Sequence, residues 1–353
     1  MLPQRTQTVV TIQYLRAVAA GLVAFHHAKG IPVFAHYAAH FGTVGVDLFF
    51  VISGFIMWTT TEDSRRSPVQ FWLARIIRIV PLYWFFTSIY VAAALITPES
   101  FYAVHLEAAH IVKSYLFIPA THPNLGMILP VYALGWTLNY EMFFYLVFGV
   151  CLFLPWPRLR FSVLASAFLL LVACGLLVEP SGPVSRTYTD PILLEFLAGV
   201  MIAVLSPLLM RCGSVAGFML VAAAALWVAV VFGYGFVPER IVSHGIPASI
   251  AVMGALMIEP AARARPSRLW LMLGNASYSI YLGHPFAQRV LLIGVNRTVG
   301  LASMSPTLYV FTALLAGIAG GVVCHFLIER PMLRACRRLV RARPPIAHAS
   351  PQS

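Results

Sequence analysis

Two polar side chains, Arg16 and His27, could carry out chemistry within a strongly apolar segment, TIQYLRAVAAGLVAFHHA at residues 11–28. A charged side chain near the centre of a bilayer costs at least about 2.5–3.5 kcal/mol, so we expect both to face a protein interior or a water-filled cavity. They are eleven residues apart. In an α-helix this spacing is about three turns plus about 20°, and about 16 Å along the axis. The spacing therefore predicts that both lie on one helix face, whereas His26 points about 100° away.

His27 is the first candidate for proton transfer. An imidazole titrates at about pH 6.5 and can accept a proton from a hydroxyl group. We therefore interpret His27 as a general base at one end of a membrane cavity. The alternative is a histidine at a helix end among the outer head groups. Asp47, in FGTVGVDLFFVISGFIMW, is expected at about the depth of His27, where its carboxylate could hold the imidazole tautomer.

A second group of polar residues opens two further apolar segments. Glu141 lies in GWTLNYEMFFY, beside Asn139 and Tyr140, and facing lipid would be costly. It is predicted either to pair with Arg16 or to orient a polar network, in a structural or a catalytic role. His284 precedes Pro285 in GNASYSIYLGHPF, where the proline breaks the helical hydrogen-bond ladder. Asn139, Tyr140 and His284 are predicted to bind substrate.

Two arginines follow at a spacing that suits phosphate. Arg75 and Arg78 in FWLARIIRIVPLYW are three residues apart and share a helix face. Two adjacent guanidinium groups suit a phosphate or pyrophosphate. The alternative is ordinary positive charge on the cytoplasmic side. Glu329, after the last apolar run, is expected either to bridge to these inner arginines or to have no such partner.

The chain that must position these residues has 353 residues, of which 60% are hydrophobic and 10% are charged. Soluble domains carry about 25% charged residues. The composition predicts an all-α polytopic membrane protein, because a transmembrane β-barrel would show short alternating segments. The net charge of +12 lies in short loops, so we expect no nucleic-acid partner. The five cysteines form no CxxC pair, and we expect no disulfide framework and no metal site.

The apolar runs predict about ten transmembrane helices of about 17–25 residues each. They are expected near residues 11–29, 43–60, 79–97, 132–154, 161–178, 191–209, 215–233, 243–259, 271–293 and 307–328. Most Lys and Arg residues fall in connections on the side of the N-terminus. The positive-inside rule therefore predicts that both termini are cytoplasmic.

The organisation expected from these runs is one transmembrane domain, residues 1–330, followed by a basic cytoplasmic tail, residues 331–353. The tail is expected to lie along the anionic inner leaflet and to be partly disordered. Residues 98–131 are too many for a simple connection. We expect an amphipathic helix on the outer face or a rim over a polar cavity there.

Five segments, in order along residues 12–331, resemble the motifs of the membrane-bound acyltransferase type 3 family. They are the Arg-x10-His pair of Arg16 and His27, GVDLFFVISGF, the Arg-x-x-Arg pair of Arg75 and Arg78, WTLNYEMFFY and SYSIYLGHPF. The segments GWTLNYEMFFY and SYLFIP further resemble the branch that acetylates bacterial exopolysaccharides.

The resemblance implies transfer of an acyl group, usually acetyl, from cytoplasmic acyl-CoA to a glycan hydroxyl at or beyond the outer face of the bacterial inner (plasma) membrane. Acetyl-CoA would be the co-substrate. His27 then corresponds to the family's essential histidine, as base or as transient acyl carrier, with Arg16 as its partner. Arg75 and Arg78 would face the CoA phosphates, and Asp47 and Glu141 would support catalysis. Some members carry an extracytoplasmic esterase-like domain. We expect a stand-alone membrane domain here, so any second transfer step would need another protein.

Other readings of the same residues stay open at this point. A secondary transporter for a small anion or a glycan lipid would also use buried charges, but it would consume no thioester. A non-catalytic scaffold of a polysaccharide export complex would leave those charges unexplained. Within the enzyme class, succinyl-CoA is an alternative donor, and a lipid-linked oligosaccharide or a non-polysaccharide compound is an alternative acceptor. Membrane lipids and polysaccharide assembly machinery are expected partners, and the oligomeric state is left open.

Overall fold

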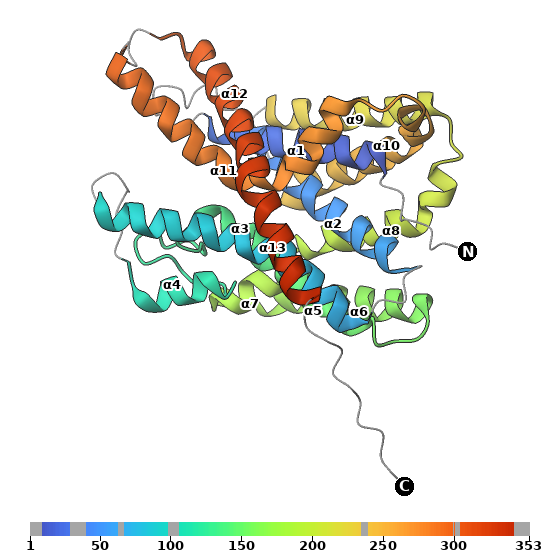
Figure 1. Cartoon of the computed structure of the whole chain (residues 1–353). Coiled ribbons are helices and arrows are strands. Elements are labelled where there is room, and N and C mark those ends of the chain that lie inside the picture. The colour runs from blue at the N-terminus through green and yellow to red at the C-terminus, as the bar shows by residue number, and fades with distance from the viewer. Residues whose placement is uncertain are drawn as a thin grey trace.

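A computed structural model of the chain describes residues 9–28, 40–62, 67–97, 106–233, 239–298, 300 and 304–341. These residues fold almost entirely into helices, and the β-structure among them is one isolated bridge between Thr121 and Ile128. The helices are α1 Val10–His27, α2 Val44–Glu62, α3 Pro68–Ile96, α4 Ala108–Tyr115, α5 Trp136–Cys151, α6 Pro157–Val178, α7 Pro183–Tyr188, α8 Leu193–Leu209, α9 Ser214–Gly233, α10 Ile246–Ala264, α11 Arg268–Thr298, α12 Pro306–Cys324 and α13 Arg330–Arg341, with π-helical segments η5 Ile241–Gly245 and η7 His325–Glu329 and short 3-10 turns η2 His40–Thr43 and η4 Ala133–Gly135. In Figure 1, α1, α9 and α10 lie on one side of the molecule and α3, α5 and α6 on the other, with α2 and α8 between them. The all-α fold class is therefore confirmed.

The described helices have the length and composition of a membrane protein. Seven of them are long and apolar enough to cross a membrane, by length and composition. They contain α2, α3, α6, α8, α9, α10 and α12. Each predicted span coincides with a helix, but α1, α5 and α11 are not among the seven. The number of about ten spans and the cytoplasmic position of both termini therefore stay predictions.

The third predicted span begins earlier than its apolar run. Ser67 and Gln70 form a capping box at the start of α3, and Pro68 occupies its first position. Such residues favour a helix start. The helix therefore runs from Pro68 to Ile96, and Arg75 and Arg78 lie inside it.

Helices α2 and α8 approach each other closely because each has a glycine at their contact. A side chain at Gly54 would collide with the backbone carbonyl of Phe196, and one at Gly199 with that of Val51. Small residues permit this close approach between membrane helices. The contact fixes α2, which carries Asp47 and Ser53, against α8.

The N-terminus of α1 is anchored by an acidic residue from another helix. The Glu259 carboxylate on α10 accepts hydrogen bonds from the backbone N–H groups of Val10 and Thr11, at 3.0 and 2.8 Å, and from Thr11 Oγ1 at 2.8 Å. Arg263 pairs with the same carboxylate. The first N–H groups of a helix have no intrahelical partner and favour a negative charge. Glu259 therefore fixes the helix that carries Arg16 and His27.

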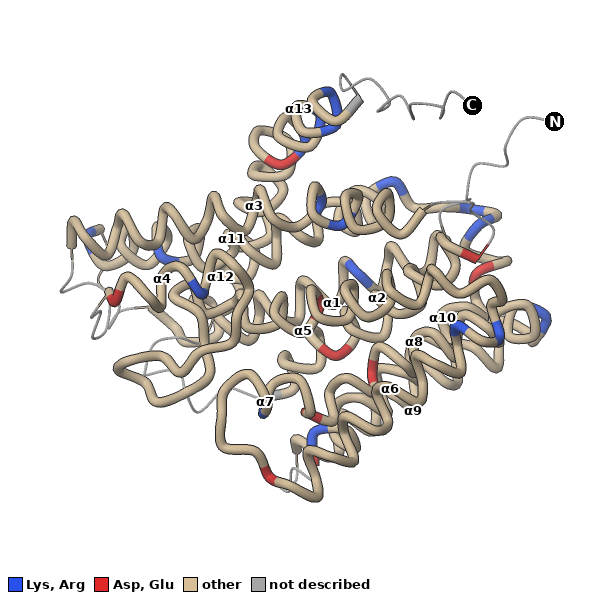
Figure 2. Tube along the Cα trace, turned by 90° about the horizontal axis from the view of Figure 1, so that it is seen from below, with Lys and Arg blue, Asp and Glu red and all other residues tan. Residues whose placement is uncertain are grey.

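Helix α13 continues from α12 through the π-helical segment η7 and projects from the body (Figure 2). Arginines recur along it. The boundary predicted at residue 330 thus falls inside a run of continuous helix, and residues 342–353 of the predicted tail lie outside the described residues. Of the long predicted outer segment, residues 98–105 also lie outside them, and the short helix α4 occupies the next part.

Candidate active site

Four predicted site residues, Arg16, Arg75, Arg78 and Glu141, line one cavity between α1, α2, α3, α5 and α11, which we call the central cavity. Its volume is about 150 Å³. Its other polar lining residues are Ser53, Thr137, Tyr145, Ser277, Tyr278 and Tyr281. Three guanidinium groups around one carboxyl group leave a positive excess, which suits an anionic ligand.

Glu141 is held by hydroxyl groups. Its Oε1 accepts hydrogen bonds from the Tyr145 hydroxyl and from Ser53 Oγ, the latter at 3.3 Å. The Arg75 guanidinium lies 6.0 Å from the centroid of the Tyr145 ring. Arg75 Nε is shielded from solvent and donates no hydrogen bond to any residue that the structure describes. Arg75 therefore keeps hydrogen-bonding capacity that a ligand in the central cavity could use.

Arg78 is already paired. It forms an ion pair with Glu329, which confirms the predicted bridge from Glu329 to one of the two arginines of α3. Glu329 also accepts a hydrogen bond from Ser279 Oγ at 2.6 Å and lies 2.6 Å from His325 Nδ1. Glu329 and His325 are the two ends of the π-helical segment η7. Such segments are frequent at functional sites, and this one places Glu329 in contact with both Arg78 and His325.

A second hollow, the arginine vestibule, adjoins the central cavity because Arg16 and Arg78 line both. Its volume is about 610 Å³. Its full lining is Arg16, Arg78, Arg268, Leu271, Met272, Asn275, His325, Phe326, Arg330 and Arg337. Among the residues that the structure describes, no Asp or Glu lines this hollow, so the vestibule is strongly positive. It can accept several phosphate groups at once.

His27 lies at the C-terminal end of α1, exposed, beside a buried histidine. Its Nδ1 is 2.9 Å from the carbonyl of Val23, and its ring centroid is 5.0 Å from that of His284. His284 is fully buried; its Nδ1 is 2.9 Å from the Ile280 carbonyl. An Nδ1–H that donates to a carbonyl leaves Nε2 as the acceptor of a neutral imidazole. His284 Nε2 has no partner among the described residues. The structure thus brings His27 and His284 together, and neither is among the residues that line the central cavity.

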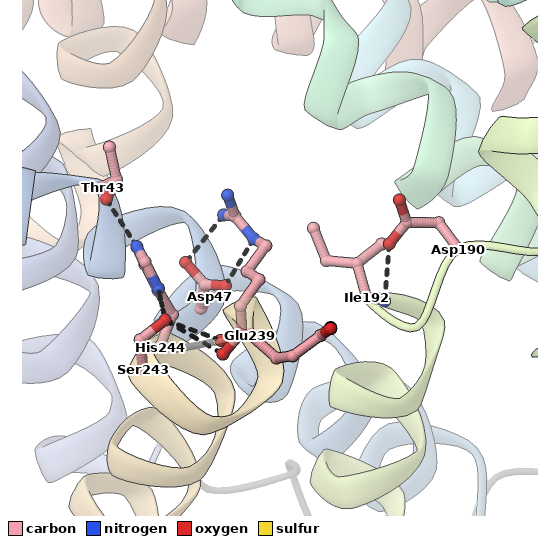
Figure 3. Close-up of polar contacts among 8 residues, drawn as sticks. Thr43, Asp47, Asp190, Ile192, Glu239, Ser243 and His244 are labelled. Atoms are coloured by element: carbon pink, nitrogen blue, oxygen red, sulfur yellow. Dashed lines mark hydrogen bonds and ion pairs between the residues drawn. The ribbon is translucent and has the colours of Figure 1, made fainter. Parts of the chain in front are cut away.

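Asp47 is fully buried and binds a residue other than the expected His27. Arg240, just before η5, donates to both of its oxygens, Nε to Oδ1 at 3.0 Å and Nη2 to Oδ2 at 2.9 Å (Figure 3). A guanidinium fork matches a carboxylate in two places, which an imidazole cannot do. The contact between Asp47 and His27 that depth alone suggested is therefore replaced by a contact between Asp47 and Arg240. Arg240 also lies 5.5 Å from the centroid of Trp136.

Next to this ion pair, a chain of polar contacts runs through η5. Ser243 Oγ is 2.6 Å from His244 Nδ1, and His244 Nε2 is 2.8 Å from Thr43 Oγ1 (Figure 3). Ser243 and His244 are both buried. The chain ties the segment before α10 to the turn before α2.

Asn139 and Tyr140 lie apart from the central cavity, in what we call the Asn139 pocket. Its volume is about 120 Å³. Its lining is Ile128, Trp136, Asn139, Tyr140, Arg186, Thr187 and Asp190. Consecutive residues of α5 therefore face different sites, because Glu141 turns to the central cavity.

Residues that the sequence analysis missed include Arg240, Tyr145 and Gln288. Gln288 donates from Nε2 to the Ala24 carbonyl at 2.8 Å, so it links α11 to α1 near the histidine pair. Tyr145 and Gln288 each follow a predicted site residue by four positions, so helical spacing could have found them. Arg240 lies in a connection, where nothing local distinguishes it. Among the residues that the structure describes, no group of three or more His, Cys, Asp or Glu side chains is arranged to hold a metal ion.

Comparison with known proteins defines the class. Residues 9–326 match the model of the acyltransferase domain family, so the chain belongs to this family and the resemblance of its motifs is confirmed. The chain is 38% identical over 308 residues to the exopolysaccharide production protein ExoZ of Rhizobium meliloti, which covers 84% of this chain and 91% of that protein. It is 28% identical over 321 residues to the peptidoglycan O-acetyltransferase OatA of Listeria monocytogenes, covering 78% of this chain and 49% of that protein. No solved structure matches the chain. Membrane-bound O-acyl transfer is the activity that the family and these relatives support.

Proposed function

We propose that this protein transfers an acyl group, with acetyl as the first candidate, from cytoplasmic acyl-CoA to a hydroxyl group of a bacterial exopolysaccharide or its lipid-linked precursor. The relative named as an exopolysaccharide production protein supports this acceptor class. The protein would cross the inner membrane several times, with both termini and the arginine vestibule on the cytoplasmic side.

The observation that carries the proposal is the arginine vestibule joined to the central cavity. Acyl-CoA carries its phosphates at one end and its thioester at the other, on a long slender arm. The vestibule would hold the phosphates on Arg268, Arg330 and Arg337, which line it. The arm would pass Arg16 and enter the central cavity, where Arg75 offers its unused Nε.

The chemical step needs a base near the acceptor. As the acceptor oxygen forms its bond to the thioester carbon, the carbon–sulfur bond breaks and the hydroxyl proton passes to a base, which then gives it to the departing thiolate, so that CoA leaves as the thiol. His27 Nε2 is the proposed base, or the atom that carries the acyl group transiently. His284 would orient the His27 ring from its buried position. Tyr281 lines the central cavity and precedes His284 by three residues on α11, so one helix connects the two places.

The test is CoA release by the purified protein with His27→Ala, using His26→Ala as the matched control. General base catalysis contributes about 10²–10⁴-fold, so His27→Ala is expected to lose at least about 100-fold in turnover. His26→Ala is expected to keep most of it. Equal turnover in both variants would remove His27 from the mechanism. If the wild-type protein binds acetyl-CoA but releases no CoA with any glycan offered, the transporter alternative gains support.

A further inference from the structure

The Asn139 pocket has a buried hydrogen-bond acceptor with no donor. Asn139 is 3% exposed, and its Oδ1 accepts no hydrogen bond from any residue that the structure describes. Buried polar atoms in folded proteins nearly always have a partner, and one without a partner is costly. Asn139 lines the pocket, so a turn of its amide would bring Oδ1 to an O–H or N–H donor of a ligand there.

The charges of the pocket favour a neutral, hydroxyl-rich ligand. Arg186 supplies donors only, and Asp190 supplies acceptors only. One cation and one anion in a small site disfavour a phosphate and a free cation alike, whereas a hydroxyl group can donate to Asp190 and accept from Arg186. One Asp190 oxygen accepts from the Ile192 backbone N–H at 2.9 Å, while Figure 3 shows the other turned away from that contact. The Ile192 contact thus orients the carboxylate, and a ligand hydroxyl at its other side would share Asp190 with the nearby Tyr140 hydroxyl.

The remaining wall of the pocket is aromatic and rigid. The Trp136 ring is 5.9 Å from that of Tyr140, nearly perpendicular to it, and the Arg240 guanidinium lies 5.5 Å from the Trp136 centroid. Because Asp47 holds Arg240 in two places, the guanidinium group beside Trp136 is fixed. A flat apolar ring next to hydroxyl-binding groups suits a sugar ring, which has apolar C–H faces and a rim of hydroxyl groups.

The pocket is large enough for such a ring. Its volume is about 120 Å³. A single buried water requires a cavity of about 10–15 Å³, so a ligand of several heavy atoms fits. The pocket lies where α5 and α8 begin. Under the proposed orientation that end of both helices faces outwards, as the acceptor requires.

We propose that the Asn139 pocket binds a neutral hexopyranose unit of the acceptor glycan, with Asn139 Oδ1 and the outward-turned Asp190 oxygen accepting hydrogen bonds from its hydroxyl groups and Trp136 against its face. This inference rests on the proposed function, because it names where the acceptor of that reaction is held. Asn139, Trp136 and Asp190 are binding residues in this scheme and take no part in proton transfer.

The experiment is ligand-observed saturation-transfer NMR with methyl β-glucopyranoside and methyl β-galactopyranoside as the probes. The full-length protein is held in lipid nanodiscs, because detergents with sugar head groups would compete. The wild-type protein is expected to transfer saturation to at least one probe. Asn139→Ala and Asp190→Asn are expected to weaken its binding roughly tenfold each, which corresponds to the loss of one hydrogen bond. Asn124→Ala, in a neighbouring loop outside the pocket lining, is the matched control and is expected to match wild type.

Acetyl-CoA binding shows whether the variants are folded. CoA release tests the proposed function separately. The two pocket variants are expected to bind acetyl-CoA as wild type does. Unchanged sugar binding in both variants, with acetyl-CoA binding intact, overturns the inference. So does a wild-type protein that transfers no saturation to either sugar. CoA release without sugar binding would support the proposed function and overturn the sugar site. Sugar binding without CoA release would support the sugar site and count against the proposed function.

Discussion

Arg75 and Arg78 are three residues apart on α3, yet their surroundings give them different tasks. Arg78 neutralises Glu329, which is 1% exposed, whereas Arg75 stacks near Tyr145 and keeps an unused Nε. Their spacing predicted two equivalent phosphate ligands. Because Glu329 is far along the chain, the spacing could not show that one of the two was already paired.

Replacement of each arginine by alanine is therefore expected to have a different effect. Arg78→Ala leaves the Glu329 carboxylate buried without its cation, which costs about 3–5 kcal/mol of stability for a broken buried pair. Arg75→Ala is expected to weaken acetyl-CoA binding with little change in stability. Thermal unfolding and calorimetric binding to acetyl-CoA measure the two effects. The same loss of stability in both variants would contradict the assignment.

The sequence did not predict which buried charged side chains contact each other. Residue type and helix position were enough to predict that Arg16 and Glu141 face the protein interior, and both line the central cavity together with Arg75 and Arg78, which were expected in a cytoplasmic connection. The partner of Asp47 was not predictable, because Arg240 lies 193 residues away in a connection. Depth in the membrane suggested His27, but depth along two helices does not fix which side chains face each other.

At the scale of elements, the position of α1 depends on a cap supplied by α10. Glu259 binds the first N–H groups of α1 and Arg263 together. Glu259→Gln removes the charge and leaves Arg263 without its carboxylate, so a loss of about 1–3 kcal/mol is expected. Thermal unfolding measures this loss of stability, and Glu179→Gln, at an exposed glutamate, is the control. Turnover should fall as well, because α1 carries Arg16 and His27. Equal melting temperatures for the two variants would show that α1 does not depend on this cap.

The segment around α4 contains a pH-sensitive contact outside the spans. Burial lowers the pKa of His110, and the nearby His122, whose ring centroid is 5.3 Å away, lowers it further. Burial also lowers the pKa of His122. Both histidines therefore favour the neutral form when folded. Their contribution to stability is present above the ordinary pKa of about 6.5 and is lost as the pH falls below it.

We accordingly expect the α4 segment to open as the pH falls from 7 towards about 5. The backbone N–H of Val131, which donates to Ser114 Oγ at 2.9 Å, reports on the opening by hydrogen exchange. His110→Asn should reduce the pH dependence, because one of the two titrating groups is gone. Protection that stays constant over this range, after correction for the intrinsic exchange rate, would contradict the expectation.

At the scale of the whole molecule, apolar runs alone were enough to predict the long helices and their order, though not α7 or α13, because each run must find a continuous hydrogen-bonded form in lipid. They were not enough to predict the extent of the helices. A capping box extends α3, and η7 joins α12 to α13. As a result, arginines assigned to a connection and to a tail, such as Arg75 and Arg337, belong to helices that line the central cavity and the arginine vestibule.

The shape of the vestibule leads to a prediction about donor recognition. Arg337 and Arg338 are neighbours on α13, but only Arg337 lines the arginine vestibule. If the vestibule holds the phosphates of acyl-CoA, Arg337→Ala raises the KM for acetyl-CoA several-fold, and Arg338→Ala leaves it near the wild-type value. The KM should also rise with salt, because exposed charges are screened beyond about 8–10 Å at 0.10–0.15 M ionic strength. S-acetyl-N-acetylcysteamine has the thioester but no phosphate, so its turnover should be insensitive to salt and to Arg337→Ala. Equal salt sensitivity for the two donors would mean that the phosphates are bound elsewhere and that the vestibule has another role.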